Sequence, residues 1–143
     1  MTRAITGMTQ ELGGLSRRMS YSLENESHRN LPASLKSHYN ITINEKIVRL
    51  DFDGEEINLF ARGECDGQPI CLVGESKLQL DERRNSRRAA EEILNQIDKK
   101  AAVVQRRYPD AEIVRVLLTH YARPAVLERT KERGVLVIQS FEW

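Results

Sequence analysis

The sequence has no long apolar run, which excludes one broad class of protein at the outset. No stretch of the 143 residues approaches the roughly 18 consecutive apolar residues of a membrane-spanning helix. The first residues, MTRAITGMTQELGG, are polar and lack the apolar core of a signal peptide. The chain is therefore expected to be cytoplasmic and to make no membrane contact.

Cysteine and histidine are scarce as well. The two cysteines, Cys65 and Cys71, are too few for a zinc site made of thiolates alone. Their spacing leaves a disulfide open, but a reduced intracellular pair is the favoured interpretation. The three histidines share no metal-ligand spacing; they are His28, His38 and His120. A chain of this length can bury a core without a disulfide or a metal, so none of these residues is needed as a structural staple.

Charge of one sign is not in excess. The 22 basic and 21 acidic residues give a net charge of +1, so the overall balance does not indicate a nucleic-acid partner. The basic residues are, however, concentrated on one segment with helical neighbour spacing. They are Arg83, Arg84, Arg87 and Arg88, followed by Lys99, Lys100, Arg106 and Arg107. Such a run forms either a solvated helix face or a surface that tracks phosphate groups.

Hydrophobic periodicity predicts an α/β domain. The predicted order of elements is α, α, β, β, β, α, β, α, β, which describes a mixed sheet flanked by helices. In the second helix, Asn30 would be the cap and Pro32 would lie in the first turn. The predicted helices cover about residues 9–28, 31–39, 81–108 and 124–133, and the predicted strands are 47–52, 55–62, 69–80, 112–120 and 135–141. The buried stripe of the third helix is Ile93, Ile97, Ala101 and Val104.

A hairpin turn at Asp66-Gly67 fixes a register for the second and third strands. Asp-Gly between two strand-like runs is a strong signal for a two-residue turn, so paired positions sum to 133. Asn58 then lies opposite Glu75, and Glu56 lies opposite Lys77. Residues two apart on a strand share a face, and directly opposed Cβ atoms are about 5 Å apart. Pro69 could introduce a bulge that shifts this register by one.

This arrangement predicts a cation site. Mg²⁺ in proteins takes one or two carboxylates plus water, and Glu75 can supply one such oxygen. Further oxygens would come from the amide of Asn58, the main-chain carbonyl of Ser76 and, as a possible ligand, Glu56. Lys77 would stand over the same ion, where its ammonium can orient water or stabilise charge developing on a phosphodiester. The alternative is an ordinary cross-strand salt bridge, since Glu-x-Lys is common in a chain this charged.

The runs INLFARG and ICLVGESKLQL resemble the hairpin of PD-(D/E)XK nucleases, a superfamily with a restriction endonuclease-like fold. They resemble most closely its prokaryotic nuclease-like members in which a long coiled coil often precedes the domain. The resemblance implies a flexible or coiled-coil-like segment at 1–14 and a nuclease-like domain at 15–143. It implies catalytic roles for Glu24, Glu75 and Lys77, with Mg²⁺ or Mn²⁺ as the cofactor. Nucleic acid, most readily DNA, would be bound by Gln79, Arg83, Arg84, Arg87 and Arg88.

Two departures from that pattern leave the activity open. Asn58 stands where the superfamily usually has aspartate, and the loss of one negative charge should lower the affinity for a divalent metal. The glutamine-tyrosine helix motif of recombination nucleases is also missing. Glu24 could be a plain surface residue, as could Glu26. One hypothesis is a Mg²⁺-dependent nuclease that hydrolyses DNA. The other is a catalytically degenerate module that binds nucleic acid or forms oligomers, with a homodimer through the N-terminal helix as one form.

Overall fold

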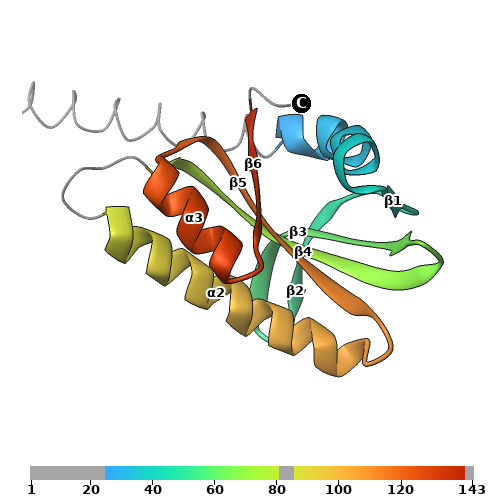
Figure 1. Ribbon diagram of the computed structural model, residues 1–143. Helices are drawn as coiled ribbons and strands as arrows, with labels where there is room; N and C mark the ends of the chain where they lie inside the picture. The colour runs from blue at the N-terminus through green and yellow to red at the C-terminus, as the bar shows by residue number, and fades with distance from the viewer. Residues whose placement is uncertain (1–24, 81–85, 141–143) are drawn as a thin grey trace, which may run out of the picture.

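A mixed β-sheet lies between helices on its two faces (Figure 1). The computed structural model describes residues 25–80 and 86–140. The strands are β1 (Ile41–Ile43), β2 (Val48–Phe52), β3 (Glu55–Cys65), β4 (Gln68–Leu80), β5 (Glu112–Ala122) and β6 (Leu136–Gln139). The helices are residues 25–39, α2 (Ser86–Arg107) and α3 (Pro124–Glu132). In the sheet the strand order is β1-β3-β4-β5-β6, and β2 pairs with β3 as well.

The β3–β4 hairpin has the predicted turn and the predicted register. Asp66 and Gly67 both have positive φ, 52° and 79°, as a two-residue type I′ turn requires. The strands pair antiparallel from Cys65–Gln68 to Leu59–Gly74, so every pair sums to 133. Pro69 pairs within this ladder and introduces no shift. The hairpin therefore brings the strand ends near residues 58 and 75 together, as the sequence predicts.

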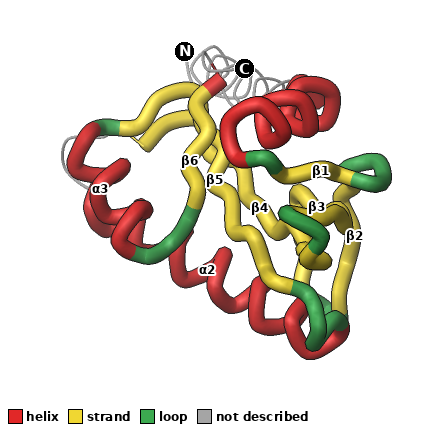
Figure 2. Tube along the Cα trace, turned by 45° about the vertical axis from the view of Figure 1, so that its right-hand side comes forward, coloured by secondary structure: helices red, strands yellow, loops and turns green. Residues whose placement is uncertain are grey.

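The second half of the sheet is parallel. β4 pairs parallel with β5, and β5 with β6, while α2 and α3 connect them. Because the residue before a proline is held extended, Arg123 caps α3 and Pro124 begins it. Gly134, with φ of 72°, ends it. Figure 2 shows α2 and α3 on one side of the strands and the helix of residues 25–39 on the other. The predicted α/β class, a mixed sheet flanked by helices, is confirmed.

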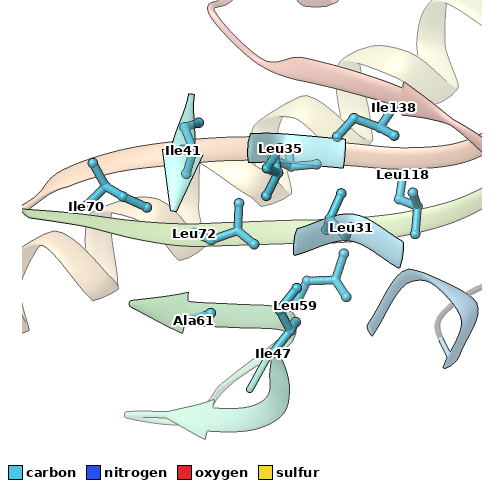
Figure 3. Close-up of a cluster of buried hydrophobic side chains, with 11 residues drawn as sticks. Leu31, Leu35, Ile41, Ile47, Leu59, Ala61, Ile70, Leu72, Leu118 and Ile138 are labelled. Atoms are coloured by element: carbon cyan, nitrogen blue, oxygen red, sulfur yellow. The ribbon is translucent and has the colours of Figure 1, made fainter. Parts of the chain in front are cut away.

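The helix of residues 25–39 covers the sheet face opposite α2. Leu31 and Leu35 are fully buried and pack on β3, β4, β5 and β6 (Figure 3). On the other face, the predicted stripe of α2 is buried as well. Complete burial of one such side chain contributes about 2 kcal/mol. Both helices are therefore held by packing against the sheet.

Two details of the prediction were wrong. The helix that covers residues 25–39 is already formed before Asn30, so Asn30 and Pro32 lie inside it and not at its start. The error arises because the buried position one turn earlier is the polar Ser27, which hydropathy does not reveal. The sheet also has a strand that was not predicted, β1, which has only three residues. A Cβ atom added to Gly63 would lie 2.2 Å from a β1 carbonyl oxygen, so glycine permits this close pairing. The helix predicted over residues 9–28 lies largely outside the described residues.

Within the described part of the chain, no helix is both long enough and apolar enough to cross a membrane. Cys65 and Cys71 are free thiols, which agrees with the prediction of a reduced pair.

A network of ion pairs joins α2, α3 and β5. Asp98 of α2 binds Arg115 of β5 and Arg133 at the end of α3. Glu91, about two helical turns before Asp98 on the same face of α2, forms an ion pair with Arg129 and a second one, 3.1 Å long, with Arg133. The network fixes the helical layer against the parallel strands, because each arginine comes from a different segment than its acid.

Acid should weaken this network through Asp98. Burial raises the pKa of Asp98, but hydrogen bonds and charge from Arg133 and Arg115 outweigh burial, so the pKa lies below its ordinary value of 3.8. A carboxyl group with a depressed folded-state pKa contributes stability above its unfolded pKa and loses it as pH falls through the folded value. We therefore expect Asp98→Asn to destabilise the protein near pH 6 and progressively less below about pH 4. Urea unfolding at several pH values between about 6 and below 4 measures the difference in the free energy of unfolding between Asp98→Asn and the unmodified chain. Glu128→Gln, an exposed change on α3, is the control and should show no such trend.

Candidate functional site

Two of the predicted site residues meet where the β3–β4 ladder ends. The side-chain amide of Asn58 donates a hydrogen bond of 2.6 Å from Nδ2 to Oε2 of Glu75. The Glu75 side chain is only 6% exposed, on the sheet face that α2 covers. Sequence reasoning placed these two residues opposite each other, and the contact confirms that they meet.

Lys100 of α2 completes this cluster. Its ammonium group forms an ion pair with Oε1 of Glu75, and its side chain is 14% exposed. The two carboxylate oxygens of Glu75 are therefore bound by different donors, one charged and one neutral. A buried carboxylate is tolerated only when it is paired and hydrogen-bonded in this way. We refer to Asn58, Glu75 and Lys100 as the buried triad.

Sequence reasoning missed the role of Lys100, which it assigned to an exposed basic run. A signal for it was present. Lys100 lies three residues after Ile97 and four before Val104, and both of these are buried. It therefore lies within the apolar stripe of α2, where i+3 and i+4 spacing keeps residues on one face. A lysine at such a position needs an acid opposite it, and Glu75 is the buried acid on the facing strand.

Lys77 lies beyond the triad on the same strand. Because residues two apart share a face, Lys77 follows Glu75 on the α2 side, while Ser76 between them belongs to the other face. Lys77 is exposed and makes no ion pair with any residue of 25–80 or 86–140. Among the described residues at the end of β4, the ammonium groups of Lys77 and Lys100 stand against the carboxylate of Glu75, so these three groups together carry a charge of +1 (2 − 1).

The described residues do not fit a divalent cation at this position. Mg²⁺ and Mn²⁺ need free oxygen ligands, but Lys100 occupies Oε1 of Glu75 and the Asn58 amide nitrogen occupies Oε2. Among the residues that the structure describes, no group of three or more Asp, Glu, His or Cys side chains is placed to hold a metal. The charge of +1 that Glu75, Lys77 and Lys100 carry together also opposes a dication.

Glu56 does not take part in the cluster. The β3–β4 ladder stops at Leu59–Gly74, whereas β2 pairs with β3 from Phe60 to Glu55, with a register irregularity between Val48 and Leu50. The carboxylate of Glu56 accepts a hydrogen bond of 2.7 Å from Arg49 of β2. The predicted pairing of Glu56 with Lys77 is therefore absent from the described ladder, and Glu56 pairs with Arg49 instead.

The expected nucleic-acid contacts are only partly visible. Glu24, Arg83 and Arg84 lie outside the described residues, as do the side chains of Gln79 and Arg87. Arg88 lies in the first turn of α2, with its side chain 82% exposed and 3.4 Å from Glu92. Exposure of this kind agrees with either a solvated face or a phosphate-binding one.

The chain is an α/β domain whose single sheet combines the antiparallel β3–β4 hairpin with the parallel strands β4, β5 and β6. A family model for a domain of unknown function, DUF8196, matches residues 25–142. The chain therefore belongs to this family. No curated protein matches it.

Three solved structures are similar to the chain. An fdxN element excision controlling factor protein from Anabaena variabilis has a TM-score of 0.50 at 13% identity, with 82% of this chain and 93% of that chain covered. An XisH family protein from Nostoc punctiforme PCC 73102 has a TM-score of 0.48 at 15% identity, with 80% and 92% covered. A chain in the EndoMS-dsDNA2 complex has a TM-score of 0.46 at 14% identity, with 68% and 37% covered. At these identities the similarity concerns the fold alone.

Proposed function

We propose that this chain is a PD-(D/E)XK nuclease-like domain that binds the phosphate backbone of nucleic acid without a metal ion and does not cleave it. The order of elements and the Glu-x-Lys of β4 support the nuclease-like part. The observation that carries the rest is the ion pair between Lys100 and Glu75. It neutralises the carboxylate that a metal would need, and it leaves Lys77 as an exposed positive charge beside it.

The charge at the end of β4 favours a phosphate over a cation as the group that binds there. With Asn58 in place of an aspartate, the described groups of Glu75, Lys77 and Lys100 together carry a charge of +1, which repels a dication and attracts a phosphodiester. A lysine ammonium is a compact charge with three donors and is a common phosphate ligand. Arg88, at the start of α2, adds a second exposed cation near the chain segment that follows β4. The proposed contact is therefore electrostatic and independent of base sequence.

One observation favours a second candidate, a Mg²⁺- or Mn²⁺-dependent nuclease. Asn58 and Glu75 lie side by side, as two metal ligands would. This function requires that Lys100 leave Glu75 and that the Asn58 amide turn its oxygen toward the ion. It predicts metal-dependent nicking of supercoiled plasmid that is lost in Lys77→Ala, whereas the first proposal predicts no nicking with either metal.

Salt-dependent DNA binding tests the proposed function. We expect duplex binding, followed by fluorescence anisotropy, to weaken steeply as salt rises. Lys77→Gln should reduce the slope of log K against log salt by about 0.9, the value for one lost phosphate contact on duplex DNA. Lys46→Gln, an exposed lysine in the loop before β2, removes the same charge elsewhere and should leave the slope unchanged. Equal effects of the two substitutions would count against a site at Lys77, and no binding at low salt would reject the proposal.

A further inference from the structure

A cavity of about 330 Å³ lies at the end of β4 remote from the buried triad. It is an open cavity bordered by the tip of the β3–β4 hairpin and by the segment that joins α2 to β5, which lie together on the right of Figure 1. A hydrogen bond of 3.4 Å from Gln68 to the Asp110 carbonyl joins these two segments. Cys71, on the cavity wall, and Lys77 are six residues apart on one strand, or about 20 Å at 3.3 Å per residue. The cavity is thus separate from the site proposed above.

Two guanidinium groups border this cavity, and aromatic rings hold both in place. Arg62 of β3 lies over the ring of Tyr108, 5.8 Å from its centroid, and Arg107 lies over the ring of Phe52 at 5.4 Å. The rings themselves pack together with Phe60, with centroids 5.0 to 6.3 Å apart. Stacking on an aromatic face orients the flat guanidinium group and leaves its N–H donors directed along its edge.

The charges of the two arginines are not equally available. Arg62 is paired with Glu45, whose pKa is lowered chiefly by the hydrogen bonds from Arg62. Arg107 makes no ion pair with any residue that the structure describes. Asp110 also borders the cavity, but its side chain is exposed. Arg107 is therefore the cation that a ligand could use.

The rest of the cavity wall is mostly apolar. Pro69, Ile70 and Cys71 of β4 and Ala111 before β5 contribute to it, beside the half-buried ring of Tyr108. The volume lies at the lower end of the range of small-molecule sites, about 300 to 1,000 Å³. Apolar walls with one available cation at the rim suit a flat, weakly polar group that carries an anion at one end.

We propose that this cavity binds a planar ring compound with an anionic group, with the ring against Tyr108 and the β4 wall and the anion on Arg107. Two sources supply this chemistry, a nucleoside monophosphate and an aromatic carboxylate. Neither needs the buried triad, and the proposal does not depend on the function proposed for Lys77.

Calorimetric titration of the full chain tests this proposal. The probes are adenosine 5′-monophosphate and benzoate, with adenosine as the ring without the anion and inorganic phosphate as the anion without the ring. We expect one or both of the two anionic ring compounds to bind at least tenfold more tightly than adenosine and phosphate, because a charged hydrogen bond and ring burial act together. The compound that binds identifies the source. Binding of neither below millimolar concentration, or equal binding of adenosine or phosphate, would overturn the proposal.

A pair of neighbouring arginines supplies the matched control. Arg107→Gln should weaken binding about tenfold, since it removes a charged hydrogen bond. Arg106→Gln makes the same change one residue earlier, at an exposed position that does not border this cavity, and should leave affinity unchanged. Arg107→Lys keeps the charge and should retain part of the affinity. Unfolding temperatures establish that each variant is folded. Equal weakening in the Arg106 and Arg107 variants would show that only general charge is involved and would overturn the proposal.

Discussion

Replacement of Lys100 by methionine is expected to lower the free energy of unfolding by about 3 kcal/mol. Removal of one partner from a buried ion pair leaves an uncompensated charge, and such changes cost about 3 to 5 kcal/mol. The residual exposure of Lys100, 14%, places the effect at the lower end of that range. Methionine keeps most of the aliphatic packing on α2. The loss of stability can therefore be attributed to the absence of the Lys100 ammonium group. Urea unfolding at neutral pH measures it.

The adjacent lysine is the control for this change. Lys99 has a side chain 71% exposed and an ion pair of 3.0 Å with Glu55. Because exposed pairs contribute at most about 1 kcal/mol, Lys99→Met should have a much smaller effect. Adding Glu75→Gln to Lys100→Met removes the negative charge of Glu75, which the single variant leaves without its ammonium partner. The double variant should therefore regain a large part of the lost stability. Similar losses in the two single variants, or no recovery in the double variant, would show that Lys100 does not neutralise Glu75.

Asn58→Asp is expected to destabilise the protein by about 2 kcal/mol at neutral pH in the absence of metal. The substitution replaces a hydrogen bond of 2.6 Å to Glu75 by a contact between two carboxylates. Loss of a hydrogen bond to a charged group costs about 1.5 to 3 kcal/mol. Like charges this close also raise the pKa of one of the two groups, so the loss should diminish at acidic pH, where a shared proton restores the contact. Urea unfolding at two pH values measures both effects.

We expect the same variant to respond to metal and the unmodified chain to show no response. The added carboxylate presents two oxygens to a dication where Asn58 presents an amide nitrogen to Glu75, and it adds a negative charge beside that of Glu75. A ligand that binds only the folded state raises its stability with concentration, so Mn²⁺ should raise the unfolding temperature of Asn58→Asp and EDTA should abolish the rise. Asn44→Asp, in the exposed loop after β1, adds the same charge and should show no such response. An equal response in both variants would indicate nonspecific binding.

The parts of this structure that local rules determine could be predicted from the sequence. The Asp66-Gly67 turn requires positive φ at both positions, and once it is placed, the alternation of side chains fixes the whole hairpin register. That register correctly brought Asn58 and Glu75 together. The parallel strands and their helices followed from apolar runs that alternate with a helical stripe.

The parts that depend on neighbouring segments could not be predicted in this way. β1 has too few residues for a periodic signal, and it forms because Gly63 lets its backbone approach β3. Glu56 contacts Arg49 because β2 pairs with this part of β3 and the β3–β4 ladder ends at Leu59, which no pattern within the hairpin reveals. Lys100 was taken for a surface charge because charge counts ignore the face of the helix on which a residue lies.

The central claim is that the ion pair with Lys100 excludes a metal from Glu75. Calorimetric titration of the unmodified chain with Mn²⁺, beside Glu75→Gln, tests it most directly. We expect the two titrations to be indistinguishable up to millimolar Mn²⁺. A stoichiometric binding heat in the unmodified chain that disappears in Glu75→Gln would contradict the account and favour the metal-dependent nuclease.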